Sequence, residues 1–154
     1  MSSDGTKLIT DNRKARFNYE LFDRVEAGIA LKGTEVKSLR EGKLSLVESY
    51  CRIDGDEEVT LVDAHIAVYG HGNVHNHEPA RPRKLLLHKR EIRRLRSKVR
   101  EKGLTLVPTR AYFRRGKVKV EIALAKGKKQ HDKRQAVKER DTERELRRAE
   151  RAQR

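Results

Sequence analysis

Residues 104–113 (LTLVPTRAYF) and 117–124 (KVKVEIAL) are two apolar runs joined by the short basic segment Arg114, Arg115 and Gly116. In the second run, valine, isoleucine and leucine alternate with lysine and glutamate, which is the period-two pattern of a strand with one buried face. A connection of this length, containing a glycine, is typical of a hairpin. The sequence therefore predicts an antiparallel hairpin, and with it a mainly β fold.

Upstream of this hairpin the chain offers further strands. Residues 17–31 spread β-branched and aromatic side chains among charged ones, as in a long half-exposed strand, and Gly28 within it predicts a bulge or bend. Residues 50–53 and 59–62 flank Asp54-Gly55, a strong turn signal, and so predict a second hairpin.

Two short helices are expected between the strands. The first covers residues 34–42, with Thr34 as its N-cap and Gly42 at its end. The second covers residues 85–99, where a narrow apolar stripe ends before Gly103. Residues 69–83 are rich in glycine, histidine, asparagine and proline and predict a long loop.

These elements predict three regions. Residues 1–12 are expected to form a flexible N-terminal arm, because they are polar and contain glycine. Residues 13–125 suffice for one small domain, which we expect to be a partly closed antiparallel barrel of about six strands with small flanking helices, since closure removes exposed strand edges. Residues 126–154 form a basic C-terminal tail.

The charge of the chain predicts a polyanionic partner. Its 154 residues include 38 Lys and Arg against 23 Asp and Glu, a net charge of +15, which favours binding to nucleic acid or an anionic membrane surface. No apolar run reaches the roughly 18 residues of a membrane span, and the first residues lack the apolar core of a signal peptide. We therefore expect a cytoplasmic protein with no membrane partner. The single Cys51 excludes an internal disulfide and a multi-thiolate metal site, and is expected to fill the core.

Basic residues are concentrated in one internal segment. Residues 81–102 contain 11 Lys and Arg against only Glu91 and Glu101. Like charges spaced four apart on a helix repel one another, so this density favours an anionic ligand, and nucleic acid is the simplest one.

The tail has a different character, because it cannot build a core. Residues 126–154 carry 12 Lys and Arg against 6 Asp and Glu, no aromatic residue, and only Val137 and Leu146 as large apolar side chains. Burial cannot offset the entropy of ordering such a segment, so we expect it to be disordered when free and ordered by a polyanion.

No catalytic apparatus is evident in the sequence. The carboxylates Glu26, Glu35 and Glu41 lack a paired nucleophile and are interpreted as structural ion pairs. The isolated glycines form no phosphate-binding loop. His71 and His75, with His77, have ligand-like spacing but no cysteine beside them, so loop histidines are favoured over a metal site. We expect no enzyme activity, no metal and no cofactor.

Five runs in one order carry a resemblance to a known family: residues 26–28 (EAG), 33–40 (GTEVKSLR), 83–88 (RKLLLH), 102–108 (KGLTLVP) and 125–134 (AKGKKQHDKR). The chain resembles the SmpB family of SsrA-binding proteins over residues 12–141. The resemblance implies an OB-like barrel that binds the tRNA-like domain of transfer-messenger RNA and delivers that RNA to stalled ribosomes for trans-translation. It also implies a monomer whose tail enters the vacant message channel beside the decoding centre of the 70S ribosome.

The resemblance places RNA contacts at Glu26, Leu86 and Lys119, and we add Arg83 and Lys84 from the adjacent basic stretch. A carboxylate such as Glu26 can accept from base amino or ribose hydroxyl groups, which fixes an orientation that a lysine would not. In the tail, the expected contacts to ribosomal RNA are the cations Lys128, Lys129, Lys133 and Arg134, with Asp132 between them, and His131, which could stack on a base.

The tail also has the pattern of a conditional helix. Residues 132–152 lack proline and glycine, and Asp132 is a candidate cap, yet the segment is polar nearly all round. We therefore expect it to become helical only against a phosphate-lined channel, which a message already present would block.

Two other classes of function remain open. A structural ribosomal protein could hold ribosomal RNA with the same basic body and tail, and composition alone does not separate it from a rescue factor. An RNA-modifying enzyme or nuclease would need a clustered catalytic set that the sequence lacks.

Overall fold

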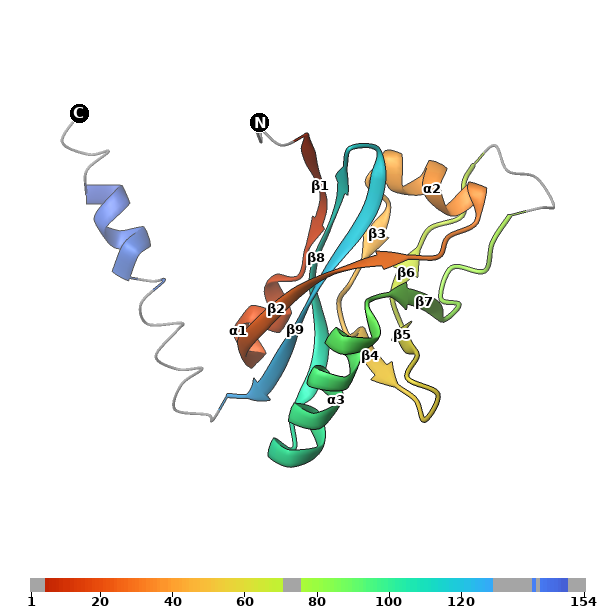
Figure 1. The fold of residues 1–154 in the computed structure, drawn as a ribbon. Helices are drawn as coiled ribbons and strands as arrows, with labels where there is room; N and C mark the ends of the chain where they lie inside the picture. The colour runs from red at the N-terminus through yellow and green to blue at the C-terminus, as the bar shows by residue number, and fades with distance from the viewer. Residues whose placement is uncertain (1–4, 71–75, 129–139, 141, 150–154) are drawn as a thin grey trace.

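The computed structural model describes residues 5–70, 76–128, 140 and 142–149. These residues form a mainly β fold with small helices, as the sequence predicts (Figure 1). The elements in chain order are β1 (Thr6–Asp11), α1 (Arg13–Asn18), β2 (Tyr19–Ile29), α2 (Gly33–Arg40), β3 (Leu44–Ser45), β4 (Tyr50–Ile53), β5 (Val59–Val62), β6 (His65–Ile66), β7 (Arg83–Leu86), α3 (Lys89–Lys102), β8 (Thr105–Arg114) and β9 (Lys117–Gly127).

Six strands close into a ring. The sheet order is β1-β8-β4-β5-β7-β2-β9, and the pairing of β9 back onto β8 completes the circuit. All pairings in this sheet are antiparallel. β1 is not part of the ring and pairs with the C-terminal half of β8. Side chains that point inward from the six strands fill the interior of the ring.

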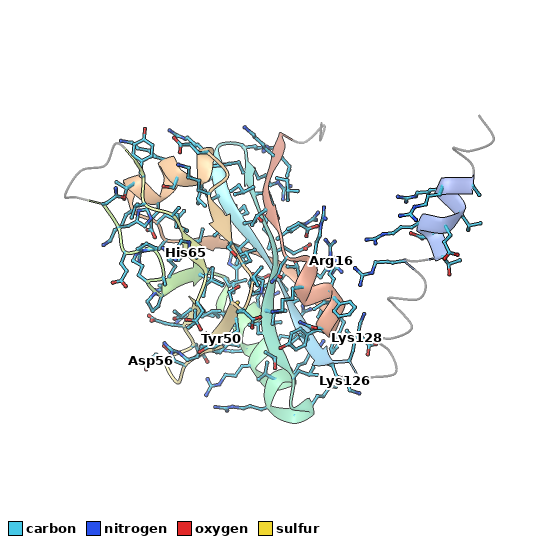
Figure 2. The ribbon with its side chains drawn as sticks, turned by 180° about the vertical axis from the view of Figure 1, so that it is seen from behind. Arg16, Tyr50, Asp56, His65, Lys126 and Lys128 are labelled. Atoms are coloured by element: carbon cyan, nitrogen blue, oxygen red, sulfur yellow. The ribbon has the colours of Figure 1, made fainter. Side chains whose placement is uncertain are left out.

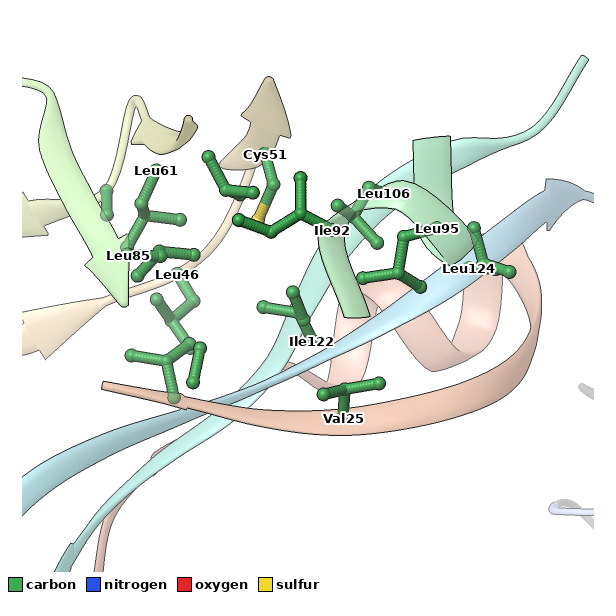
Figure 3. Packing of buried hydrophobic residues seen from close by; sticks show 14 of the residues in the cluster. Val25, Leu46, Cys51, Leu61, Leu85, Ile92, Leu95, Leu106, Ile122 and Leu124 are labelled. Atoms are coloured by element: carbon green, nitrogen blue, oxygen red, sulfur yellow. The ribbon is translucent and has the colours of Figure 1, made fainter. Parts of the chain in front are cut away.

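The core occupies the inside of this ring. Val120, Ile122 and Leu124 alternate along β9 and are at most 1% exposed, and burial of each contributes about 1.5–3 kcal/mol. Ile92 and Leu95 of α3 pack into the same cluster (Figure 3). The apolar stripe predicted for this helix is therefore its core face, which leaves its other faces to carry charge.

The two hairpins match the sequence predictions closely. β8 and β9 are joined by the turn that contains Gly116, which has φ +79°. β4 and β5 pair from Tyr50 opposite Val62 to Ile53 opposite Val59. The Asp54 carboxylate closes the second turn by accepting hydrogen bonds from the backbone N–H groups of Asp56 and Glu58, each at 3.0 Å.

The N-terminal arm prediction is wrong for residues 6–11. These residues form β1, which pairs with β8 from Thr6 opposite Arg114 to Asp11 opposite Arg110. The buried Asn12 secures this strand, because its side-chain amide donates to the carbonyls of Leu46 and Pro108 at 3.2 and 2.9 Å. The same side chain caps α1, a helix that the sequence analysis did not predict.

The bulge predicted at Gly28 lies elsewhere. The register of β2 against β9 shifts between Phe22 and Val25, where Asp23 has φ +53°. Gly28 instead pairs on both sides and allows β7 to approach, because a Cβ at this position would lie 3.2 Å from the Cβ of Leu86.

Both predicted helices form, but each begins at a different residue. Thr34 lies inside α2, whose start is closed by the Glu35 carboxylate accepting from the Lys32 N–H at 2.8 Å. α3 begins at Lys89, not at residue 85, because the preceding residues belong to β7. Gly103 ends α3 in the left-handed conformation with φ +61°, as predicted.

The last described residues belong to the tail. Residues 142–149 are helical, within the stretch 132–152 that the sequence predicts as helix (Figure 1). The guanidinium of Arg140, also helical, lies over the ring of Phe17 at 5.0 Å from its centroid. The expectation that this segment orders only against RNA stays a prediction. Among the described residues, no helix is long and apolar enough to cross a bilayer.

Candidate RNA interface

One row of register partners crosses five strands on the outside of the ring. The partners are Leu8 opposite Tyr112, Tyr112 opposite Lys119, Lys119 opposite Gly28, and Gly28 opposite Leu86. Their strand neighbours, such as Ala27, Leu85 and Val120, point into the core, so this row points away from it. We call the outward side chains of β1, β8, β9, β2 and β7 the outer face.

A second row beside it carries charge. Arg110 lies opposite Glu121, and Glu121 lies opposite Glu26. The Arg110 guanidinium pairs with Glu121 at 3.2 Å and lies 5.7 Å from the centroid of the Tyr112 ring. The outer face thus combines apolar, aromatic and charged side chains within two adjacent rows.

Glu26 is held at the junction of these rows. Its Oε2 accepts a hydrogen bond from the Tyr112 hydroxyl and another from Arg114 Nη1 at 3.0 Å. The Tyr112 bond is the main cause that lowers the pKa of Glu26; burial opposes it, and Arg114 and Lys119 add to the lowering. The carboxylate therefore stays ionised at neutral pH. Its side chain is 32% exposed, which leaves it accessible to a ligand.

The outer face is hollowed beside Glu26. The hollow has a volume of about 490 Å³ and is open to solvent. Its lining comes from three strands of the ring and from β1: Thr6, Leu8, Glu26, Arg110, Tyr112, Arg114 and Glu121.

The structure brings together four of the five predicted RNA contacts of the body. Glu26, Leu86 and Lys119 lie within neighbouring strands of the outer face, and Leu86 is 52% exposed. Lys84 alternates with Leu86 on the exposed side of β7 and pairs with Glu58 at 3.4 Å. The mixture of an acceptor, a cation and an apolar contact suits a folded RNA, whose bases, riboses and phosphates differ in what they offer.

Arg83 is a correction, because it is fully buried and cannot touch RNA. Its guanidinium donates to Glu35 Oε2 at 2.6 Å and to the carbonyls of Ala64 and Pro79 at 2.8 and 2.9 Å. Arg81 pairs with the other oxygen of Glu35. Arg83 therefore holds the loop before β7 against α2, and its role is structural.

Two further glutamates and one histidine have their contacts within the protein. Glu35 is buried in the arginine network, and Glu41 pairs with Lys43 at 2.9 Å, as the sequence interpretation expects. His77 is buried, with Nδ1 2.9 Å from the Thr34 hydroxyl and Nε2 2.9 Å from the Ile66 carbonyl. His71 and His75 lie outside the described residues. The described residues contain no group of three or more potential metal ligands.

A second basic region lies near the start of the tail. Figure 2 labels Arg16 on α1 and Lys126 and Lys128 at the end of β9, all on the same side of the molecule. The Lys128 N–H donates to the Asn18 carbonyl at 3.0 Å, which fixes where the tail leaves the body. The other predicted tail contacts, Lys129, His131, Asp132, Lys133 and Arg134, lie outside the described residues.

Sequence reasoning missed the partners of Glu26. Tyr112 and Arg114 are two residues apart in β8, and so share a face, but only the register of three strands places them beside Glu26. The alternation in residues 104–113 shows which side chains share a face; it does not show which strand lies next to them.

Comparison with known proteins gives one consistent result. A family described as "SmpB protein" matches residues 9–152. An SsrA-binding protein of Trichodesmium erythraeum is 56% identical over 96% of this chain and 95% of its own length, and one of Acidothermus cellulolyticus is 60% identical over 94% and 91%. A solved structure described as "tmRNA-SmpB: a journey to the center of the bacterial ribosome" is similar with a TM-score of 0.66 and 51% identity, over 83% of this chain and 93% of that one.

Proposed function

The chain belongs to the SmpB family, and on that basis we propose that it binds the tRNA-like domain of transfer-messenger RNA and delivers this RNA to stalled bacterial ribosomes for trans-translation. The similarity covers nearly the whole length of its relatives, so the proposal applies to the chain as a whole. It acts by binding, without catalysis and without a cofactor, in the cytoplasm where ribosomes work.

The observation that carries this proposal is the convergence of Glu26, Leu86 and Lys119 on the outer face. These three positions are far apart in the sequence and lie on the separate strands β2, β7 and β9. Gly28 lies between Leu86 and Lys119, and the Leu86 side chain lies against it, because a Cβ at Gly28 would be 3.2–3.8 Å from three atoms of that side chain.

Each contact has a distinct part in recognition. Lys119 offers a charge to a phosphate, which positions the RNA but reads no base. Glu26 accepts from base amino or ribose hydroxyl groups and repels phosphate, so it favours one orientation of the RNA. Leu86 provides an exposed apolar surface for a base or ribose.

The tail acts on the ribosome in the same proposal. Its charge and lack of core residues favour binding to the ribosomal RNA that lines an empty message channel, next to the decoding centre of the small subunit. Replacing Asp132, Lys133 and Arg134 together with alanine should leave binding to transfer-messenger RNA intact and abolish peptide tagging in a reconstituted translation assay. Normal tagging by this variant would show that the tail does not sense the channel.

Filter binding with the isolated tRNA-like RNA domain tests the body. We expect Lys119→Ala and Glu26→Gln to weaken binding at least about fivefold, roughly 1 kcal/mol, with stability changed by less than about 0.5 kcal/mol, because both positions are on the surface. Lys43→Ala and Glu41→Gln are matched controls, since that pair lies outside the outer face. If charge alone bound the RNA, both lysine variants would weaken binding equally and both glutamine variants would strengthen it; that result would refute the outer face as the site.

The rival assignment is a structural ribosomal protein, which would remain on ribosomal subunits through a high-salt wash. A rescue factor should instead copurify with one small stable RNA. Sequencing the RNA bound to the protein from native cells separates the two.

A further inference from the structure

We propose that Tyr112 and Arg114 are positioning residues for RNA recognition: they hold the Glu26 carboxylate by one oxygen and leave the other oxygen directed to the RNA. This inference rests on the proposed function, and specifically on Glu26 as an RNA contact. Neither residue was among the contacts assigned from sequence.

The hydrogen bonds at Glu26 are unequally shared between its two oxygens. Tyr112 and Arg114 both donate to Oε2, from two positions on β8. No described residue donates to Oε1. A carboxylate can accept about four hydrogen bonds, so Glu26 keeps capacity for a ligand at Oε1 while its orientation is fixed at Oε2.

Tyr112 is well suited to hold a neighbour in place. Only 8% of it is exposed, and its ring lies between the Leu8 and Lys119 positions of the same row. Burial, and then the bond to Glu26, raise the pKa of Tyr112, so its hydroxyl keeps its proton and remains a donor. A glutamate on an exposed strand otherwise samples several rotamers, and ordering it on binding would weaken the complex.

The charges around Glu26 support the same arrangement. Arg114 and Lys119 face it with positive charge, and Glu121, its register partner on β9, faces it with negative charge. Arg110 offsets Glu121 by pairing with it at 3.2 Å. Glu26 therefore remains ionised, as an acceptor only, which rejects phosphate oxygens and selects N–H and O–H donors on the RNA.

The test is a double-mutant cycle on the full-length protein with the tRNA-like RNA domain. Tyr112→Phe removes the hydroxyl and keeps the buried ring. We expect it to weaken binding about threefold to tenfold, and we expect no further loss when it is added to Glu26→Gln, because Tyr112 acts through Glu26. Tyr50→Phe, at an exposed tyrosine on β4, is the matched control and should bind as the parent does.

A pH titration separates positioning from a general structural effect. The bond from Tyr112 lowers the pKa of Glu26, so its removal raises that pKa toward the ordinary value of 4.5. As the pH is lowered, the Glu26 carboxylate should then become protonated at a higher pH in Tyr112→Phe than in the parent. NMR of the Glu26 carboxyl carbon in the free protein measures this. Arg114→Gln, at an exposed position, should move the same titration in the same direction and covers the case in which Tyr112→Phe fails to fold.

The outcomes distinguish the inference from the function beneath it. If Glu26→Gln binds the RNA as tightly as the parent, the proposed contact itself is wrong. If Glu26→Gln weakens binding but Tyr112→Phe and Arg114→Gln do not, the contact stands and the positioning role is overturned. Additive losses in the double mutant would show that Tyr112 touches RNA on its own account.

Discussion

The molecule has two glutamate–arginine clusters that differ in solvent access. One joins Glu35 to Arg83, and the other joins Glu26 to Arg114 on the outer face. Glu35 and Arg83 are both fully buried, and every oxygen and most donors in the cluster are satisfied by protein. Glu26 and Arg114 are 32% and 45% exposed at their side chains, and one carboxylate oxygen is left without a partner among the described residues. The same pair of residue types thus stabilises the fold in one place and stays accessible to a ligand in the other.

This difference matters because Glu26, Glu35 and Arg83 all lie in runs that carry the family resemblance. Arg83 and Lys84 are adjacent and both basic, so the sequence gives no reason to assign them different roles. In the structure Arg83 is fully buried, whereas the Lys84 side chain is 52% exposed. A charged residue whose hydrogen bonds are all made within the protein has nothing left for RNA. A charged residue with an unused acceptor or donor at the surface does.

The largest expected effect is at the buried cluster. Arg83→Met leaves the buried Glu35 with only one arginine and removes the donors to Ala64 and Pro79. Breaking a buried ion pair on one side typically costs about 3–5 kcal/mol, so we expect a loss of that order in the free energy of unfolding by urea.

Lys84→Met is the matched control for Arg83→Met, one residue away but exposed. It should change stability by less than about 0.5 kcal/mol and weaken RNA binding. If Arg83→Met were as stable as the parent and lost only RNA affinity, the contrast between the clusters would be wrong.

Acid should also weaken the buried cluster. Burial raises the pKa of Glu35, but the hydrogen bonds from Arg81, the Lys32 backbone and Arg83 outweigh it and hold the pKa below the ordinary value of 4.5. The folded pKa is therefore depressed, so the stability that Glu35 contributes is present above pH 4.5 and is lost as the pH falls through the folded pKa.

Glu35→Gln should reduce that acid-dependent loss of stability, measured as the change in urea midpoint between pH 6 and pH 3. Glu41→Gln, at an exposed pair, is the control and should leave the acid dependence as in the parent. An unchanged acid profile in Glu35→Gln would show that the network contributes no linked stability.

The smallest expected effect is at Gly28, on the outer face. Gly28→Ala places a Cβ 3.2 Å from Leu86 Cβ, so β7 must shift by a few tenths of an ångström. We expect a destabilisation of about 1 kcal/mol or less, together with weaker RNA binding because the added Cβ displaces Leu86.

The sequence predicted best what depends on neighbouring residues. The turn at Asp54-Gly55 formed because Asp54 bonds to the backbone two and four residues on, and Gly103 ended α3 because the next residue had to be left-handed. β1 was missed because its partner, β8, lies about a hundred residues away and nothing within Thr6–Asp11 shows that pairing.

The sequence supplies proposed members of the candidate site, but it does not show how they are arranged. Glu26, Leu86 and Lys119 came from resemblance, while Tyr112 and Arg114 required the register of β8 on β9 and of β9 on β2. Arg83 was misassigned because basic residues on both sides of it conceal its burial. The alternation of β7 shows the correct assignment, since Arg83 shares the inward face of Leu85.

Site-specific photocrosslinking tests the central claim most directly. A benzophenone amino acid placed at position 86 on the outer face, or at position 47 outside it, would replace Leu86 or Val47, which are 52% and 48% exposed and so are matched in access. With the isolated tRNA-like RNA domain, we predict a strong crosslink from position 86 and little from position 47. Equal crosslinking from both positions, or crosslinking from position 47 alone, would contradict the outer face as the surface that binds this RNA.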